Sequence, residues 1–118
     1  MGLIRNALPS IIFIICGVAL KLWAPEEVNG IFGYRTFFSM KNKETWKEGN
    51  EFSAMMMIVS GIICLLLSAT ITFVYKDDPS ISRKISGIVT VILVLGSIFY
   101  TEIHLRKVFD KDGNRKAL

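Results

Sequence analysis

The side chains best suited to bind a ligand gather in one polar segment of the chain. Arg35 carries a planar, permanently charged guanidinium that can bind a phosphate, a carboxylate or backbone carbonyl groups. A ligand-binding role and a structural role as a clamp between this segment and the helix ends fit Arg35 equally well. Tyr34 and Trp46 are more typical of anchors at a membrane interface. Asn29 and Asn50 can hydrogen-bond each other or loop backbone, so we expect them to hold the segment closed.

Patterns that support catalysis or metal binding are missing from the sequence. One histidine and two cysteines are too few for a His-based acid–base set, a zinc cluster or a disulfide framework. The sequence has no phosphate-binding loop and no paired carboxylates at a plausible depth. The segment from Asp110 to Asn114 starts like a calcium loop but lacks the later ligands, so we expect a turn. We therefore expect a protein that is not an enzyme and that needs no metal or cofactor.

Apolar residues make up 52% of the 118 residues and are gathered into three long blocks. Because a bilayer core about 30 Å thick requires roughly 20 apolar residues in a helix, each block can cross a membrane. The blocks are apolar on every face, which favours helices over the alternating strands of a membrane barrel. The sequence thus predicts an all-α integral membrane protein. The expected organisation is a single membrane domain, residues 1–118, with transmembrane helices at about 7–24, 52–75 and 85–103, a structured loop at 25–51 and a tail at 104–118.

The loop before the second span is expected to contain a short helix. Pro25 ends the first helix, and Asn42 can cap a new helix over residues 43–51 that leads directly into the second span. Along the joined helix, a stripe of mostly small or polar residues recurs at three- or four-residue steps. We expect this stripe to face neighbouring helices. It consists of Trp46, Asn50, Ser53, Met57, Gly61, Cys64 and Ser68.

The distribution of basic residues predicts the orientation in the membrane. With three spans, the N-terminus and the second loop share one side, and the first loop and the tail share the other. Four of the 14 Lys and Arg residues fall on the first side and ten on the second. Because short loops rich in Lys and Arg remain in the cytoplasm, we expect the N-terminus outside and the first loop and the C-terminus inside. The net charge of +4 is interpreted as this orientation signal and not as a sign of direct nucleic-acid binding.

Two charged residues lie toward the predicted inner ends of the first and third spans. Lys21 and Glu102 should share a depth, because these two helices run parallel. A Lys21–Glu102 pair would lower the cost of placing either charge near hydrocarbon. The alternative is that each side chain reaches water separately. We expect His104 to be a solvated residue at the interface.

The polar segment also resembles a family signature. Asn29, Gly33-Tyr34-Arg35-Thr36, Ser39-Met40-Lys41-Asn42, Thr45-Trp46 and Asn50 match the order and spacing of the signature of the SdpI family. These are bacterial integral membrane proteins named for immunity to a secreted sporulation-delay toxin. The chain departs from the pattern at Gly49, where the family usually has alanine. It resembles the C-terminal half of the name-giving six-span member, as a short three-helix form.

The resemblance implies a bacterial inner-membrane protein whose signature loop is cytoplasmic and binds a partner. The implied role is immunity to a membrane-active toxin, or signalling at the membrane, through binding of a toxin peptide or protein, a membrane lipid or a cytoplasmic regulator. In that family the membrane protein is thought to sequester a transcriptional repressor. The implied binding residues are Asn29, Gly33, Tyr34, Arg35, Thr36, Ser39, Asn42, Trp46 and Asn50. The alternative is a small transporter or channel subunit, which requires a homo-oligomer because three helices rarely enclose a path.

Overall fold

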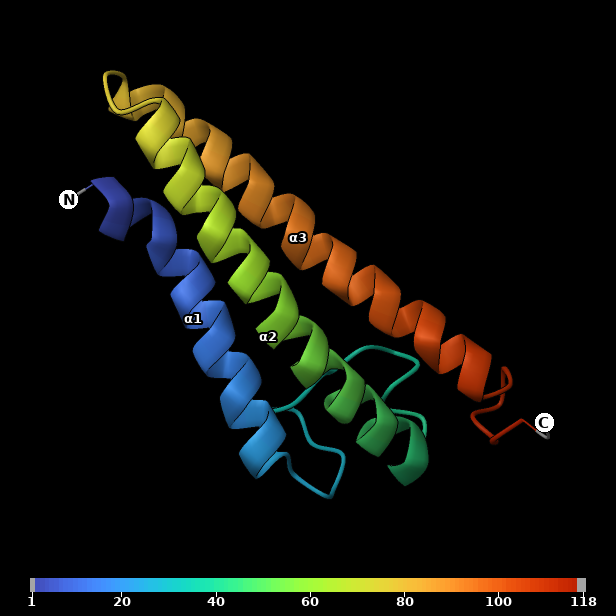
Figure 1. Ribbon diagram of the computed structural model, residues 1–118. Coiled ribbons are helices and arrows are strands. Elements are labelled where there is room, and N and C mark those ends of the chain that lie inside the picture. The colour runs from blue at the N-terminus through green and yellow to red at the C-terminus, as the bar shows by residue number, and fades with distance from the viewer. Residues whose placement is uncertain (1, 117–118) are drawn as a thin grey trace.

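The computed structural model describes residues 2–116 and contains three long helices (Figure 1). The helices are α1 (Gly2–Trp23), α2 (Lys43–Val74) and α3 (Pro79–Val108). Helix α2 lies in the centre and packs along both of its neighbours, whereas α1 and α3 touch each other less. Each helix is long and apolar enough to cross a membrane. The predicted all-α membrane fold is therefore confirmed.

Two of the helices extend beyond the apolar blocks that predicted them. Helix α1 already begins at Gly2, and α3 runs on both sides past the expected 85–103. The early start of α3 has a local cause, because Asp78 caps it by accepting from the backbone N–H of Ile81 and Pro79 occupies the first turn. An apolar block marks only the part of a helix that lies in the hydrocarbon core. The helix itself extends further, to the residues that cap its ends.

Helix α2 is continuous from the loop into the membrane, as predicted. Asn42 is its N-cap and accepts from the backbone N–H of Thr45 at 2.9 Å, while the Thr45 hydroxyl accepts from the backbone N–H of Asn42 at 3.0 Å. This reciprocal pair satisfies donors that the first turn leaves free. A helix of 32 residues is about 48 Å long, which exceeds a bilayer core of about 30 Å. The first turns of α2 therefore extend toward the headgroups, beside the loop.

The helices touch through small residues. A Cβ atom on Gly61 of α2 would meet the Ile14 side chain and would lie 3.2 Å from the backbone oxygen of Ser10. On α1, a Cβ atom on Gly17 would lie 3.1 Å from the backbone oxygen of Ala54. Such close approach lets helices associate in lipid, where there is no apolar driving force between them. The predicted inward stripe of α2 is confirmed, because its members other than half-buried Met57 are buried.

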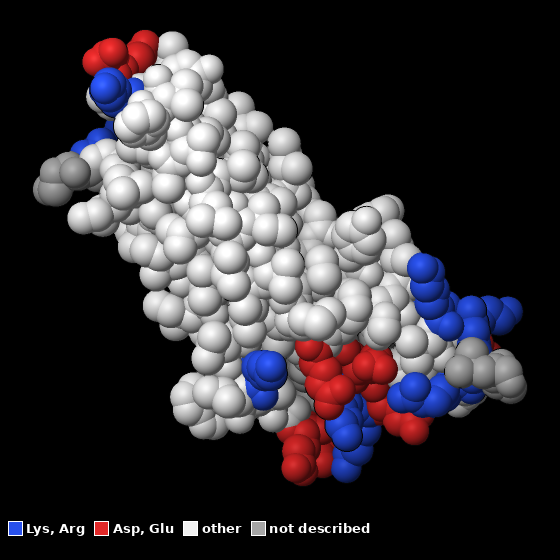
Figure 2. Space-filling model, viewed as in Figure 1, with Lys and Arg blue, Asp and Glu red and all other residues white. Residues whose placement is uncertain are grey.

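Charged side chains gather at the two ends of the bundle, and an uncharged belt separates them (Figure 2). The end with the loop and the tail carries most of them. At the opposite end, a buried polar group joins all three helices. The Asn6 amide on α1 donates to the Thr72 hydroxyl on α2 at 2.9 Å and to the Ser82 hydroxyl on α3 at 3.2 Å. The bundle is thus held by small residues along its length and by polar contacts at both ends.

The close approach of α1 and α2 predicts different outcomes for alanine at different glycines. Gly61→Ala and Gly17→Ala should lower the stability of the protein in detergent by about 1–3 kcal/mol, because backbone atoms of the partner helix must move. Gly87→Ala and Gly96→Ala are the controls, since a Cβ there meets nothing within 4 Å. These controls should be neutral or should stabilise by up to about 1 kcal/mol through helix propensity. Thermal unfolding followed by circular dichroism measures the difference, and equal stability of all four variants would contradict the close packing.

Candidate functional site: the loop between the first two helices

Residues 24–42 form a loop that folds over the first turns of α2 and rests on a buried tryptophan. Trp46 is wholly buried, and its indole N–H donates to the backbone oxygen of Pro25 at 2.7 Å. Gly33 crosses the Trp46 ring with a φ of 125°, and a Cβ at this glycine would lie 2.6 Å from the ring. Glycine is therefore required at position 33 for both its backbone conformation and its lack of a side chain. Trp46 fixes the path of the loop from below.

The two asparagines of the signature hold the loop in different ways. Asn50 is buried, and its side-chain oxygen accepts from the backbone N–H of Tyr34 at 2.6 Å. Asn29 works locally, since its side-chain oxygen accepts from the backbone N–H groups of Ile31 and Phe32, both at 2.8 Å. Of the two expected arrangements, bonding to loop backbone is therefore the one present. The two asparagines do not bond each other.

The tight turn that follows Tyr34 is held by buried hydroxyl groups. The Ser39 hydroxyl donates to the backbone oxygen of Tyr34 at 2.7 Å and accepts from the backbone N–H of Thr36 at 2.9 Å. The Thr45 hydroxyl on α2 donates to the backbone oxygen of Ser39 at 3.0 Å. Ser39 and Thr45 are both fully buried. Their bonds are therefore shielded from water and fix the turn against α2.

Glu102 of α3 ties the loop to the third helix. One oxygen of its carboxylate accepts from the Tyr34 phenol at 2.9 Å and from the Thr36 hydroxyl at 3.0 Å. Its other oxygen lies 3.6 Å from the Arg106 guanidinium, one turn along the helix. Burial raises the pKa of the Tyr34 phenol, and the hydrogen bond to Glu102 and the negative charge of that carboxylate raise it further. The phenol therefore stays protonated and remains a donor.

The ion pair between Lys21 and Glu102, one of the two alternatives for these charges, is not formed. The Glu102 carboxylate is occupied by the two loop hydroxyls and approached by Arg106. Lys21 is exposed on α1 and takes part in none of the ion pairs among residues 2–116. Shared depth in the membrane does not decide which groups pair with a charge. In the folded protein, the hydroxyl groups of Tyr34 and Thr36 donate to this carboxylate instead.

His104 differs from the solvated residue that we expected. Its ring stacks on Phe52 of α2, with the ring centroids 3.9 Å apart and an angle of 3° between the planes. Its Nε2 atom lies 3.8 Å from a carboxylate oxygen of Glu48. The signal that we missed for His104 is spacing, since Glu48 and Phe52 lie one turn apart and face α3 together.

The tail turn is as predicted, because the Asp110 carboxylate accepts from the backbone N–H groups of Asp112 and Asn114.

Arg35 is exposed and contacts its own loop. Its guanidinium donates to the backbone oxygen of Gly30. This bond matches the clamp that we considered for Arg35, although it closes the loop on itself and does not reach the helix ends. Residues 2–116 supply no other hydrogen-bond partner for this side chain, so further donors of its planar fork are available to a ligand.

A pocket of about 380 Å³ lies beneath the loop and is bounded by all three helices. Four of the predicted site residues line it, namely Gly33, Tyr34, Arg35 and Thr36. The opposite walls are mainly apolar, with Phe13, Leu20, Met57 and Ile98, and they also contain the hydroxyl groups of Ser53, Ser97 and Thr101. The remaining predicted residues, Asn29, Ser39, Asn42, Trp46 and Asn50, are not among the lining residues and instead hold the loop in place. The pocket thus combines a polar rim with mainly apolar walls, which suits an amphipathic ligand.

These features define a small multi-pass α-helical membrane protein with a folded loop at one end. Residues 26–101 match the SdpI/YfhL protein family, and the chain belongs to this family. It is similar to the uncharacterized protein YfhL of Bacillus subtilis (strain 168), with 42% identity over 52 residues. That match covers 44% of the chain and 47% of the relative, so the chain matches about half the length of this relative. No solved structure matches the chain.

The contact between Tyr34 and Glu102 predicts the effect of removing one oxygen atom. Tyr34→Phe should destabilise the protein by about 1–2 kcal/mol, because it deletes a hydrogen bond to a charged group and leaves the carboxylate with fewer partners. Trypsin should cleave after Arg35 faster in this variant. Tyr75→Phe is the matched control, since Tyr75 is exposed at the other end of α2. If the two variants unfold at the same temperature and resist trypsin equally, the hydrogen bond does not hold the loop closed.

Proposed function

We propose that this SdpI-like protein confers immunity to a membrane-active toxin by binding the toxin inside the bilayer. The observation that supports the proposal is the pocket beneath the loop, whose rim is made of the residues Gly33 to Thr36 and whose walls are mainly apolar. Several lining residues, among them Cys16, Ile31 and Ile98, are exposed on the outer surface of the bundle. A molecule already dissolved in the membrane can therefore reach the pocket from the side. The role is binding, not catalysis.

The division of the pocket into two parts suggests how an amphipathic toxin would sit. An apolar segment would lie against Phe13, Leu20 and Met57, and a polar or acidic group would reach the rim. There, the unused donors of Arg35 can bind a carboxylate or a carbonyl group. Charge-assisted bonds of this kind are roughly twice as strong as bonds between neutral groups. Arg35 therefore selects the polar end of the ligand, and the walls bind the rest.

The same loop gives the proposed signal a route to the cytoplasm. Under the predicted orientation, the loop and the tail face the cytoplasm because ten of the 14 basic residues lie on their side of the membrane. A ligand at the rim would compete with the bonds that Tyr34 and Thr36 make to Glu102. Release of these bonds would expose the loop and let it recruit a soluble regulator. Toxin binding and regulation would then use one network.

Toxin survival tests the proposal. Cells that lack their own immunity genes and express this chain should survive sporulation-delay toxin, and Arg35→Gln should lower the tolerated concentration by about tenfold, the loss expected for one charge-assisted bond. Ile98→Trp should do the same by filling the pocket. The matched controls are Lys47→Gln and Val91→Trp, which change exposed residues outside the pocket. Membrane levels of every variant are compared by immunoblot.

Three results of the survival assay would contradict the proposal. The first is a wild-type chain that is present in the membrane and gives no protection. The second is full protection by both Arg35→Gln and Ile98→Trp, because toxin recognition would then lie outside the pocket. Loss of protection in the controls as well would likewise remove the pocket as the explanation.

Cysteine labelling tests the proposed orientation. In a Cys16→Ala, Cys64→Ala background, a membrane-impermeant maleimide should label Asp77→Cys in intact protoplasts. It should label Lys47→Cys only after the membrane is opened. Both positions are exposed, and they lie at opposite ends of the bundle. The reverse labelling pattern would place the loop and the tail outside the cell.

A further inference from the structure

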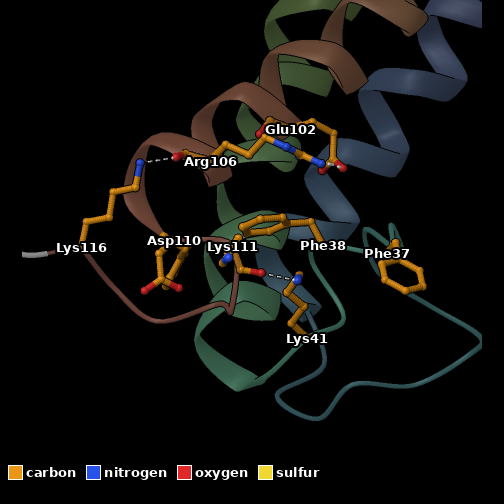
Figure 3. Close-up of a pocket in the computed structure, with 9 residues that line it drawn as sticks. Phe37, Phe38, Lys41, Glu102, Arg106, Asp110, Lys111 and Lys116 are labelled. Atoms are coloured by element: carbon orange, nitrogen blue, oxygen red, sulfur yellow. Dashed lines mark hydrogen bonds and ion pairs between the residues drawn. The ribbon is translucent and has the colours of Figure 1, made fainter.

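We propose that a second groove, between the loop and the C-terminal tail, binds the headgroup of an anionic phospholipid. The groove has a volume of about 450 Å³ and lies at the charged end of the bundle (Figure 3). Four cations line it, Lys41 from the loop, Arg106 from α3, and Lys111 and Lys116 from the tail. Two carboxylates, of Glu102 and Asp110, also line it. The site is separate from the pocket beneath the loop, and the inference does not depend on the proposed immunity role.

The groove is held open by a folded tail. Phe109 is buried beside Phe38 and Leu105, and the tail then turns back so that the backbone N–H of Lys116 donates to the backbone oxygen of Val108 at 2.9 Å. The Asn42 amide donates to the backbone oxygen of Gly113 at 2.7 Å, which fastens the tail to the start of α2. The walls are therefore in place before any ligand arrives, and the entropic cost of ordering them on binding is small.

The carboxylates in the groove are already occupied. Glu102 accepts from two loop hydroxyls and faces Arg106. Asp110 accepts from two backbone N–H groups of the tail turn. Their capacity to neutralise the lysines is therefore limited.

By contrast, Lys41 and Lys116 donate only to backbone carbonyl groups, and the Lys111 side chain makes no hydrogen bond among residues 2–116. The Lys41 ammonium donates to the backbone oxygen of Lys111, and the Lys116 ammonium donates to the backbone oxygen of Arg106 (Figure 3). Lys41 and Arg106 also lie over the Phe38 ring, at 5.1 Å and 4.9 Å from its centroid. The ion pairs among residues 2–116 are Lys43–Glu27, His104–Glu48 and Arg106–Glu102. Lys41, Lys111 and Lys116 take part in none of them, so the groove carries positive charge that fits a phosphate.

The surface of α3 below the groove indicates that the phosphate belongs to a lipid. Arg106 and Glu102 continue toward the membrane centre, at three- and four-residue steps, into a line of apolar residues on one helical face. The line consists of Phe99, Leu95, Ile92 and Ile88, which are each 59–67% exposed. Beside the groove, Phe37 is 94% exposed and points away from the bundle (Figure 3). A phospholipid fits both parts, with its headgroup among the cations and its acyl chains along α3, whereas a free phosphate would use only the first.

Lipid retention tests this site directly. The full chain is reconstituted in nanodiscs with equal amounts of phosphatidylglycerol and phosphatidylcholine, and the lipids that stay bound are counted by native mass spectrometry. We expect phosphatidylglycerol to be retained about fivefold or more over phosphatidylcholine. The triple variant Lys41→Gln, Lys111→Gln, Lys116→Gln should retain both lipids equally. The matched control Lys76→Gln, Arg83→Gln, Lys84→Gln removes the same charge at the other end of the bundle and should keep the preference.

The outcomes separate the site from general attraction between charges. Equal retention of both lipids by the wild type would overturn the proposal, as would an equal loss in the triple variant and the control. Full displacement of phosphatidylglycerol by dissolved glycerol phosphate would overturn the assignment to a lipid and leave a simple phosphate site. The single variant Lys111→Gln, whose side chain makes no hydrogen bond among residues 2–116, should lower the preference without affecting folding. An unchanged preference in both Lys111→Gln and the triple variant would also contradict the proposal.

Discussion

The attachment of the first loop to the helix ends is the interaction on which the rest of the structure depends. Trp46 supports the loop from below, Asn50 holds the backbone of Tyr34, and Glu102 holds its phenol. Without these contacts, the backbone polar groups of the loop would lie at the edge of hydrocarbon with no partner, which is costly. Because they are satisfied, an irregular segment can lie next to the membrane. Its rigidity gives the rim of the pocket beneath the loop a fixed shape.

The bundle below the loop follows a different rule, because lipid offers no apolar driving force between helices. Gly17 and Gly61 let α1 and α2 approach to backbone contact, and the buried serines of α2 and α3 fill the remaining narrow space. The large apolar side chains point outward to the lipid instead. The result is the inverse of a soluble core, with small and polar residues inside and Ile, Leu and Phe outside. The two ends of the bundle can therefore carry polar networks that a soluble protein of this size would place on its surface.

The sequence predicted the parts of the structure that depend on local pattern. Three apolar blocks were sufficient for three helices, the residues around Asn42 for the start of α2, and helical spacing for its inward face. Partner choice over long distances was predicted poorly. Glu102 lies 68 residues from Tyr34, and Lys21 was the one partner considered for it, since depth alone does not reveal the hydroxyl groups of the loop. The groove at the tail was missed for the same reason, because its lining comes from two segments that are far apart in the sequence, residues 37–41 and residues 102–116.

The two hollows of the molecule share one wall. Tyr34 and Thr36 line the pocket beneath the loop, and Glu102, which accepts their hydrogen bonds, lines the groove beside the tail. A negatively charged group in the groove would raise the free energy of the ionised Glu102 carboxylate and draw Arg106 away from it. A polar ligand at the rim would compete for the hydroxyl groups of Tyr34 and Thr36. A ligand that disturbs this wall would therefore bind the closed loop and an opened loop with different free energies. Such a difference is the physical requirement for coupling between two sites.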